Sequence, residues 1–174
     1  LHVIQHSFPT RRSSDLAVGV GDFLPGEGFE PVAAGEARVG FLICYEGIFP
    51  YIGRAYGRGG ASLLVNVTND AWFGMTSAPF QHLSMTVFRA VENRLYVARA
   101  ANTGVSAVID ATGRITARTG LFERTALTAP VKFHRIGTVY TEYGDWLVLV
   151  CLIALLVLFY RPGGPLPWLK KSRK

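Results

Sequence analysis

The chain has 174 residues, 49% of them hydrophobic, and a formal net charge of +6 at pH 7, which suits one domain with a substantial core. Positive charge gathers near the ends, in Arg11-Arg12 and Lys170–Lys174, and no basic stripe with interleaved aromatics lies between them, so we exclude nucleic acid as a partner. The two cysteines and four histidines lack the spacing of a disulfide framework or a metal site, so we predict no metal and no cofactor.

The first 16 residues differ from the rest of the sequence. They lack the small apolar cleavage region of a signal peptide, and residues 7–16 resemble translated sequencing-adapter DNA. We therefore expect residues 1–16 to be a non-native or disordered leader. Residues 19–35, rich in Gly, Pro and acidic side chains, are typical of a loop.

Alternating strand and helix patterns over residues 17–135 predict an α/β layered domain. Two helices are predicted, over 48–58 and 80–94, the second with its apolar residues on one face and its charges on the other. A turn signal at residues 110–113 predicts a hairpin. The predicted strands are 38–43, 62–67, 96–100, 105–109, 114–118 and 126–133.

Cys44 directly follows the buried strand 38–43, and Tyr45 and Glu46 come next, before a predicted helix. This order places a thiol at a sheet edge, where helix N–H groups favour its anion. We interpret Cys44 as a candidate nucleophile; the alternative is a small buried apolar residue.

A second polar segment follows strand 62–67 and therefore lies at the same sheet edge. Asn69, Asp70, Trp72 and Phe73 suit a loop that faces a substrate. The alternative is a turn whose Asn and Asp bind local backbone and whose Trp covers the core.

Residues 146–160 contain no charged side chain. As a helix they span roughly 22 Å, less than the roughly 30 Å of a hydrocarbon core. However, no face is polar, Trp146 and Tyr160 flank the segment, and basic residues follow it. We predict a transmembrane helix over 146–160, a linker over 136–145 and a basic cytoplasmic tail over 161–174; a buried core helix is the alternative.

Taken together, these motifs resemble the nitrilase (carbon–nitrogen hydrolase) superfamily and, within it, the apolipoprotein N-acyltransferase family. The resemblance covers about residues 39 to 160. The residues that carry it are Ile43-Cys44-Tyr45-Glu46, Thr68–Gly74, Gln81-His82, Arg89-Ala90, Glu92, Asn102-Thr103-Gly104 and Tyr140–Trp146.

The resemblance implies a nitrilase-like α-β-β-α sandwich, present in part, on the periplasmic side of a bacterial inner membrane. It implies a monomeric enzyme that takes an acyl chain from a phospholipid as a cysteine thioester and passes it to a diacylglyceryl-prolipoprotein. Cys44 then matches the nucleophile, the Tyr45 N–H an oxyanion donor and Glu46 a carboxylate near the active site. Asn69, Asp70, Trp72 and Phe73 are the expected substrate-binding residues.

The sequence departs from the family in one respect. The family's catalytic triad also contains a Glu and a Lys well ahead of the Cys, and no lysine precedes Cys44. We therefore expect the C-terminal part of such an enzyme, inactive by itself. A nitrilase-type amidase acting on a small amide and a non-catalytic membrane-anchored binding domain are the alternatives; an apolar C-terminal helix argues against the first and a reactive Cys44 against the second.

Overall fold

The computed structural model describes residues 28–133 and 135–160. The predicted leader 1–16 and the basic tail 161–174 lie outside the described residues. The chain divides into two compact units, one ending at Glu142 and the other starting at Tyr143. We describe each unit by itself.

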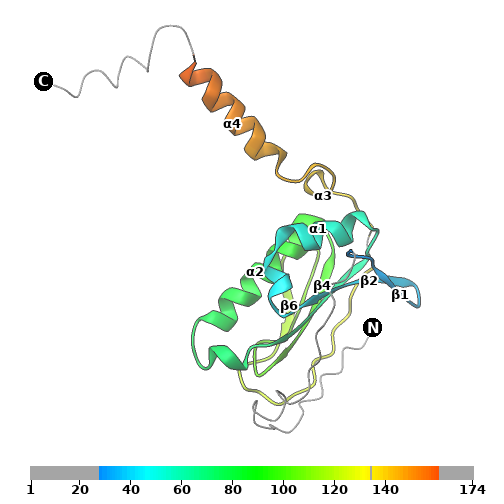
Figure 1. Cartoon of the computed structure of the whole chain (residues 1–174). Helices are drawn as coiled ribbons and strands as arrows, with labels where there is room; N and C mark the ends of the chain where they lie inside the picture. The colour runs from blue at the N-terminus through cyan, green and yellow to red at the C-terminus, as the bar shows by residue number, and fades with distance from the viewer. Residues whose placement is uncertain (1–27, 134, 161–174) are drawn as a thin grey trace, which may run out of the picture. The chain divides into compact units, whose positions relative to one another are not determined.

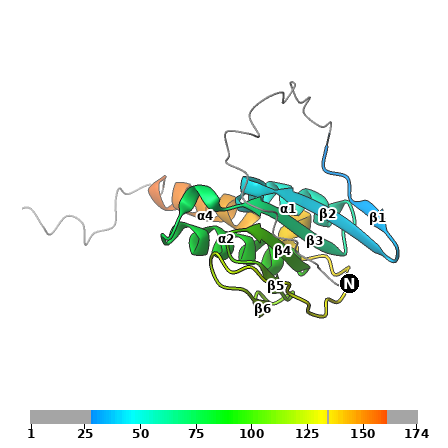
Figure 2. The ribbon, with the colours of Figure 1, turned by 90° about the horizontal axis from the view of Figure 1, so that it is seen from below.

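A six-stranded mixed sheet forms the centre of the first unit, with its strands in chain order (Figures 1 and 2). The β2–β3 and β3–β4 pairs are parallel, whereas the β1–β2, β4–β5 and β5–β6 pairs are antiparallel. The predicted α/β class is therefore confirmed. The strands are β1 (Val32–Ala34), β2 (Ala37–Ile43), β3 (Leu63–Asn69), β4 (Tyr96–Asn102), β5 (Ala107–Ile109) and β6 (Ile115–Arg118).

Two helices connect the parallel strands, as parallel pairing requires. The helix α1 (Pro50–Arg58) joins β2 to β3, and α2 (Ala78–Asn93) joins β3 to β4. Short 3₁₀ turns precede each helix, η2 (Cys44–Ile48) and η3 (Ala71–Phe73). Both helices pack on one face of the sheet and enclose the main core, whose buried members include Leu42, Ile52, Leu64, Leu83, Leu95, Val97 and Ile109.

Three details differ from the sequence predictions. Residues 32–34, predicted as loop, form the edge strand β1, and residues 126–133, predicted as a strand, form none. The charged face of α2 was also predicted wrongly. Arg89 is buried, because its guanidinium bonds to the Ile48 carbonyl at 2.8 Å and to Glu92 at 2.7 Å, whereas Phe88 and Val91 are exposed.

Among the residues that the structure describes, only part of the other face of the sheet is covered. The segment after β6 lies over it, where Val131 packs on Ala37, Val39 and Leu63. Near the ends of β2 and β3 the face remains apolar and open. Its exposed side chains there are Phe41, Ile43 and Val67.

The end of the first unit is anchored to α1 and α2. Arg54 donates to the carbonyls of Tyr140, Thr141 and Glu142 at 3.1, 3.0 and 2.8 Å. Thr138 donates to the Glu92 carbonyl at 2.6 Å. These contacts hold the short helix α3 (Val139–Tyr143) in place.

The second unit contains α4 (Trp146–Phe159), a 14-residue helix of apolar residues. Within residues 28–133 and 135–160, no helix is both long enough and apolar enough to cross a membrane. The predicted span over 146–160 therefore stays a prediction.

Candidate active site

Cys44 lies where β2 ends and η2 begins, and it is half-buried. Its φ is +52°, in the left-handed region that non-glycine residues rarely adopt. The Glu46 carboxylate accepts the N–H of Ile43 at 2.7 Å across this turn. The strand therefore ends in a tight turn at the sheet edge, and Cys44 is the first residue of that turn.

The carbonyl of Cys44 faces two side chains from neighbouring elements. Asn66 on β3 donates its amide Nδ2 to this oxygen at 3.3 Å and to the Leu42 carbonyl at 2.9 Å. His82 on α2 places Nε2 at 3.3 Å from the same oxygen. The backbone of Cys44 is therefore bonded to a strand and to a helix.

A buried ion-pair network lies beneath this turn. The guanidinium of Arg99 on β4 donates to Asp70 Oδ2 at 2.7 Å, and Asp70 Oδ1 lies 3.1 Å from His82 Nδ1 and from the Thr68 hydroxyl. Arg99 and Asp70 are each only 1% exposed. Buried charges are stable only when they are paired and hydrogen-bonded, and both conditions are met here.

The ionisation of the pair follows from its surroundings. Burial raises the pKa of Asp70, but the hydrogen bond to His82 and the charge of Arg99 outweigh it, so the pKa lies below its ordinary value. Burial lowers the pKa of Arg99, and Asp70 offsets part of that effect. Both groups remain ionised at neutral pH.

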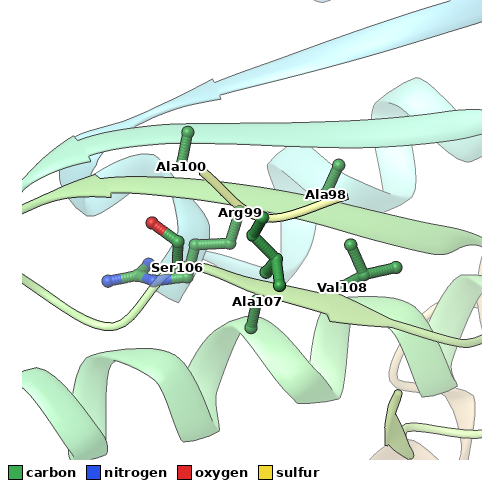
Figure 3. Close-up of a pocket in the computed structure, with 7 residues that line it drawn as sticks. Ala98, Arg99, Ala100, Ser106, Ala107 and Val108 are labelled. Carbon is green, nitrogen blue, oxygen red and sulfur yellow. The ribbon is translucent and has the colours of Figure 1, made fainter. Parts of the chain in front are cut away.

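Arg99 has further partners on three elements. Its Nη1 donates to Asn66 Oδ1 and, at 3.2 Å, to Thr86 Oγ1, and its Nε donates to the Val105 carbonyl at 3.3 Å. Figure 3 shows Arg99 leaving β4 on the side opposite Ala98 and Ala100. The hollow beside them has a volume of about 10 Å³, room for one water at most.

Aromatic side chains form the outer rim of the site. The rings of Tyr45 and His82 are stacked with centroids 5.4 Å apart, and Phe73 meets His82 edge-on at 6.0 Å. Trp72 and Met75 are each 78% exposed on the neighbouring loop. A hollow of about 100 Å³ opens between η2 and α2, lined by Tyr45, Ile48, Phe73, Ala78, Gln81, His82 and Met85.

The structure brings the sequence-predicted residues to one sheet edge but gives them different positions. Asn69 and Trp72 are exposed and Phe73 is half-buried, and their contact with substrate stays a prediction. Asn69 Oδ1 accepts the Ala71 N–H at 3.1 Å, so this side chain also shapes the turn. Asp70 lies inside the domain instead, and its described partners are Thr68, His82 and Arg99.

Sequence reasoning gave no site role to Asn66, His82, Thr86 or Arg99, which belong to this network. A signal was available, because Asn66 and Arg99 stand within the predicted strands 62–67 and 96–100, among apolar residues. A charged or amide side chain at such a position requires buried partners. Which partners these are depends on strand register, which the sequence pattern does not supply.

This combination of fold and site can be compared with known proteins. The sequence profile of the carbon–nitrogen hydrolase family matches residues 5–141. The chain belongs to the carbon–nitrogen hydrolase family. Its members of known structure include a carbon–nitrogen hydrolase from Helicobacter pylori G27, with a TM-score of 0.57 and 19% identity over 75% of this chain and 51% of that one. An amidase from Nesterenkonia sp. has a TM-score of 0.53 and 23% identity over 86% of this chain and 55% of that one.

Three relatives within the carbon–nitrogen hydrolase family are named apolipoprotein N-acyltransferase. The protein of Geobacter metallireducens is 49% identical over 82% of this chain, that of Rhodopseudomonas palustris 46% over 71%, and that of Thermotoga maritima 36% over 80%. This chain spans 27%, 23% and 28% of their lengths, respectively. The family profile, over residues 5–141, covers the sheet, α1, α2 and the site described above.

Proposed function

We propose that this chain carries the nucleophile of an apolipoprotein N-acyltransferase. The proposed reaction moves an acyl chain from a phospholipid, through a thioester on Cys44, to the amino group of a diacylglyceryl-prolipoprotein. The observation that carries the proposal is Cys44 itself, held in a left-handed turn at the carboxyl edge of a parallel strand. The names of the relatives support the choice of reaction.

The chemistry has two balanced steps. The Cys44 thiol gives up its proton and attacks the ester carbonyl carbon, a C–S bond forms, the ester C–O bond breaks, and the lysophospholipid oxygen takes up that proton. The amine then attacks the thioester, a C–N bond forms, and the C–S bond breaks to return the thiol. We propose the Tyr45 N–H as a donor to the oxyanion. Glu46 supports the turn through its bond to the Ile43 N–H.

The aromatic rim suits an apolar substrate. The hollow beside Tyr45 and Phe73 is mostly apolar and opens next to the exposed Trp72. Burial of an acyl chain there is favourable by roughly 0.8 kcal/mol per CH₂ group. We propose that Phe73 and Trp72 contact the acyl chain and that Asn69 binds a polar group of the substrate.

We further propose a membrane location for the protein. The 14 apolar residues of α4 and the basic residues after it support an inner-membrane anchor with a cytoplasmic C-terminus and a periplasmic site. The open sheet face around Phe41 and Val67 supports an α-β-β-α sandwich in which a second sheet covers this face. We propose a monomer as the active form.

A chimera tests the proposed reaction. Because this chain spans only 27% of the length of the Geobacter metallireducens relative, residues 28–160 replace the matching segment of that relative. The chimera is produced in a strain depleted of its own apolipoprotein N-acyltransferase. We expect growth, N-acylated lipoprotein and an acyl group on Cys44 by mass spectrometry. Cys44→Ser should reduce acylation to background, because a hydroxyl is a much weaker nucleophile at neutral pH.

Cys151→Ser is the matched control, since it makes the same chemical change at the exposed cysteine of α4. It should retain the activity of the chimera. An acyl group on Cys151 with Cys44 unmodified would contradict the proposal. Release of ammonia from a small amide, without acyl transfer, would favour a nitrilase-type amidase.

A further inference from the structure

The two side chains that reach the Cys44 carbonyl can each bind with either polarity. An amide presents oxygen or nitrogen depending on how it is turned, and an imidazole presents N–H or a lone pair depending on its tautomer. Of these groups, only an N–H can donate a hydrogen bond to a carbonyl oxygen. Something in the site must therefore orient Asn66 and His82.

Arg99 orients the amide of Asn66. The guanidinium has only donors, and its Nη1 bonds to Asn66 Oδ1. The amide oxygen is thus turned toward Arg99, and Nδ2 is left facing the carbonyls of Cys44 and Leu42 at 3.3 and 2.9 Å. A flipped amide would place N–H against N–H on one side and oxygen against oxygen on the other.

Arg99 and Asp70 also determine which nitrogen of His82 carries hydrogen. The Nη2 of Arg99 lies 3.2 Å from His82 Nδ1 and donates to it when that nitrogen has a lone pair. All five N–H groups of Arg99 then have acceptors, on Val105, Asn66, Thr86, Asp70 and His82. A doubly protonated ring would instead donate Nδ1–H to Asp70. In both forms Nε2 carries a hydrogen toward the Cys44 carbonyl, whereas a neutral ring with hydrogen on Nδ1 would bond to Asp70 but turn a lone pair toward that carbonyl oxygen, which is repulsive.

We propose that Arg99 is a positioning residue that holds the turn at Cys44 through Asn66 and His82. One planar guanidinium, bonded to two side chains of different elements, makes both of them donors to the same carbonyl oxygen. These bonds stabilise the left-handed backbone at Cys44, where φ is +52°. The inference rests on the proposed role of Cys44 as the nucleophile.

Lysine could not replace arginine in this role. Its ammonium has three donors on a single nitrogen and cannot bond in one plane to groups on β3, α2 and the loop before β5. Asp70 supplies the countercharge that a fully buried cation requires. The network thus explains why Asp70, expected to contact substrate, is buried.

Isotope-edited NMR of the full chain tests this inference. Labelling with [1-¹³C]Cys and [¹⁵N]Tyr gives one carbonyl–amide correlation, because Cys44-Tyr45 is the only Cys-Tyr pair in the sequence. We expect an upfield ¹³C shift of the Cys44 carbonyl in Asn66→Asp, which retains a partner for Arg99 but presents oxygen to the carbonyl. We expect the Cys44 carbonyl ¹³C signal to move upfield in Arg99→Lys as well. The imidazole ¹⁵N spectrum, assigned with His82→Gln, should show hydrogen on Nε2 of His82.

Asn93→Asp is the matched control, because Asn93 is also buried and donates to a carbonyl, that of Arg89, at 3.0 Å. It should leave the Cys44 signal in place. The inference would be overturned if Asn66→Asp and Arg99→Lys fold but leave the Cys44 carbonyl signal unmoved. It would also be overturned if His82 is neutral with hydrogen on Nδ1 alone. Neither measurement depends on acyl transfer, so an absent thioester with these shifts present would overturn the proposed function alone.

Discussion

Cys44 shows how much of the site depends on a single residue's backbone. A non-glycine residue in a sparsely populated φ region costs of order 1–3 kcal/mol and persists only where neighbours stabilise it. Here the stabilising groups are the Glu46 carboxylate on one side and Asn66 and His82 on the other. The backbone position of Cys44 therefore depends on side chains from three other parts of the chain.

Gly40 on β2 allows a close approach between the sheet and α1. A Cβ atom at this position would lie 2.5 Å from Cγ and 2.8 Å from Cβ of Tyr56 on α1. We expect Gly40→Ala to lower the free energy of unfolding by about 1–3 kcal/mol through overpacking. Urea denaturation followed by tryptophan fluorescence measures this change.

Gly28→Ala is the control for this prediction, because a Cβ atom there meets no atom within 4 Å. It should leave the urea midpoint close to that of the parent chain. Equal midpoints for Gly40→Ala and the parent would show that α1 can move away from β2 at little cost.

The helix α2 illustrates why an element's faces depend on its neighbours. Its inner face carries His82 and Thr86, which bond to the site, and Arg89, which bonds to the Ile48 carbonyl. Phe88 is 60% exposed on the outside. Hydrophobic spacing alone predicts the reverse, with Phe88 inside and Arg89 outside. That prediction fails because polar groups with specific buried partners compete with apolar side chains for the inner face.

The β5–β6 hairpin gives a prediction at the scale of one element. Asp110 accepts hydrogen bonds from the Thr112 hydroxyl at 2.6 Å, the Thr112 N–H at 2.8 Å and the Arg114 N–H at 3.0 Å. The hydroxyl bond of Thr112 is the largest cause that holds the pKa of Asp110 below its ordinary value. The folded chain therefore keeps this carboxylate ionised to lower pH than the unfolded chain does.

The sign of the effect on stability follows from this difference. The contribution is complete above the unfolded pKa of about 3.9 and is lost as pH falls through the lowered folded pKa. We expect Asp110→Asn to reduce stability at pH 6, with the difference from the parent shrinking toward pH 3. Thermal denaturation at several pH values measures it, and a difference that grows on acidification would contradict the prediction.

At the scale of the whole molecule, the chain combines an α/β unit with an apolar helix. The sheet unit leaves Phe41, Ile43 and Val67 exposed, and α4 carries apolar residues on all sides. Surfaces of this kind favour contact with lipid or with further protein. We propose the membrane for α4.

A charge substitution in α4 tests this proposal. In the parent chain we expect a membrane fraction that resists alkaline carbonate. Leu152→Arg together with Leu155→Arg should make the chain extractable, because each arginine at a helix centre costs about 2.5–3.5 kcal/mol of insertion free energy. The control, Thr116→Arg with Thr128→Arg, adds the same charge at exposed positions of the first unit and should remain in the membrane. Extraction of the parent chain would contradict the proposal.

The sequence by itself determined the α/β class, the strands around Cys44 and the nucleophile candidate, because these follow from short apolar runs and from residues adjacent in the chain. Tertiary structure decided the rest. Asp70 follows β3, His82 lies on α2 and Arg99 on β4, and they meet only because β3 and β4 pair in one parallel register with α2 packed across them. A pattern along the chain records which residues are polar; only the register and packing show which of them share a buried charge.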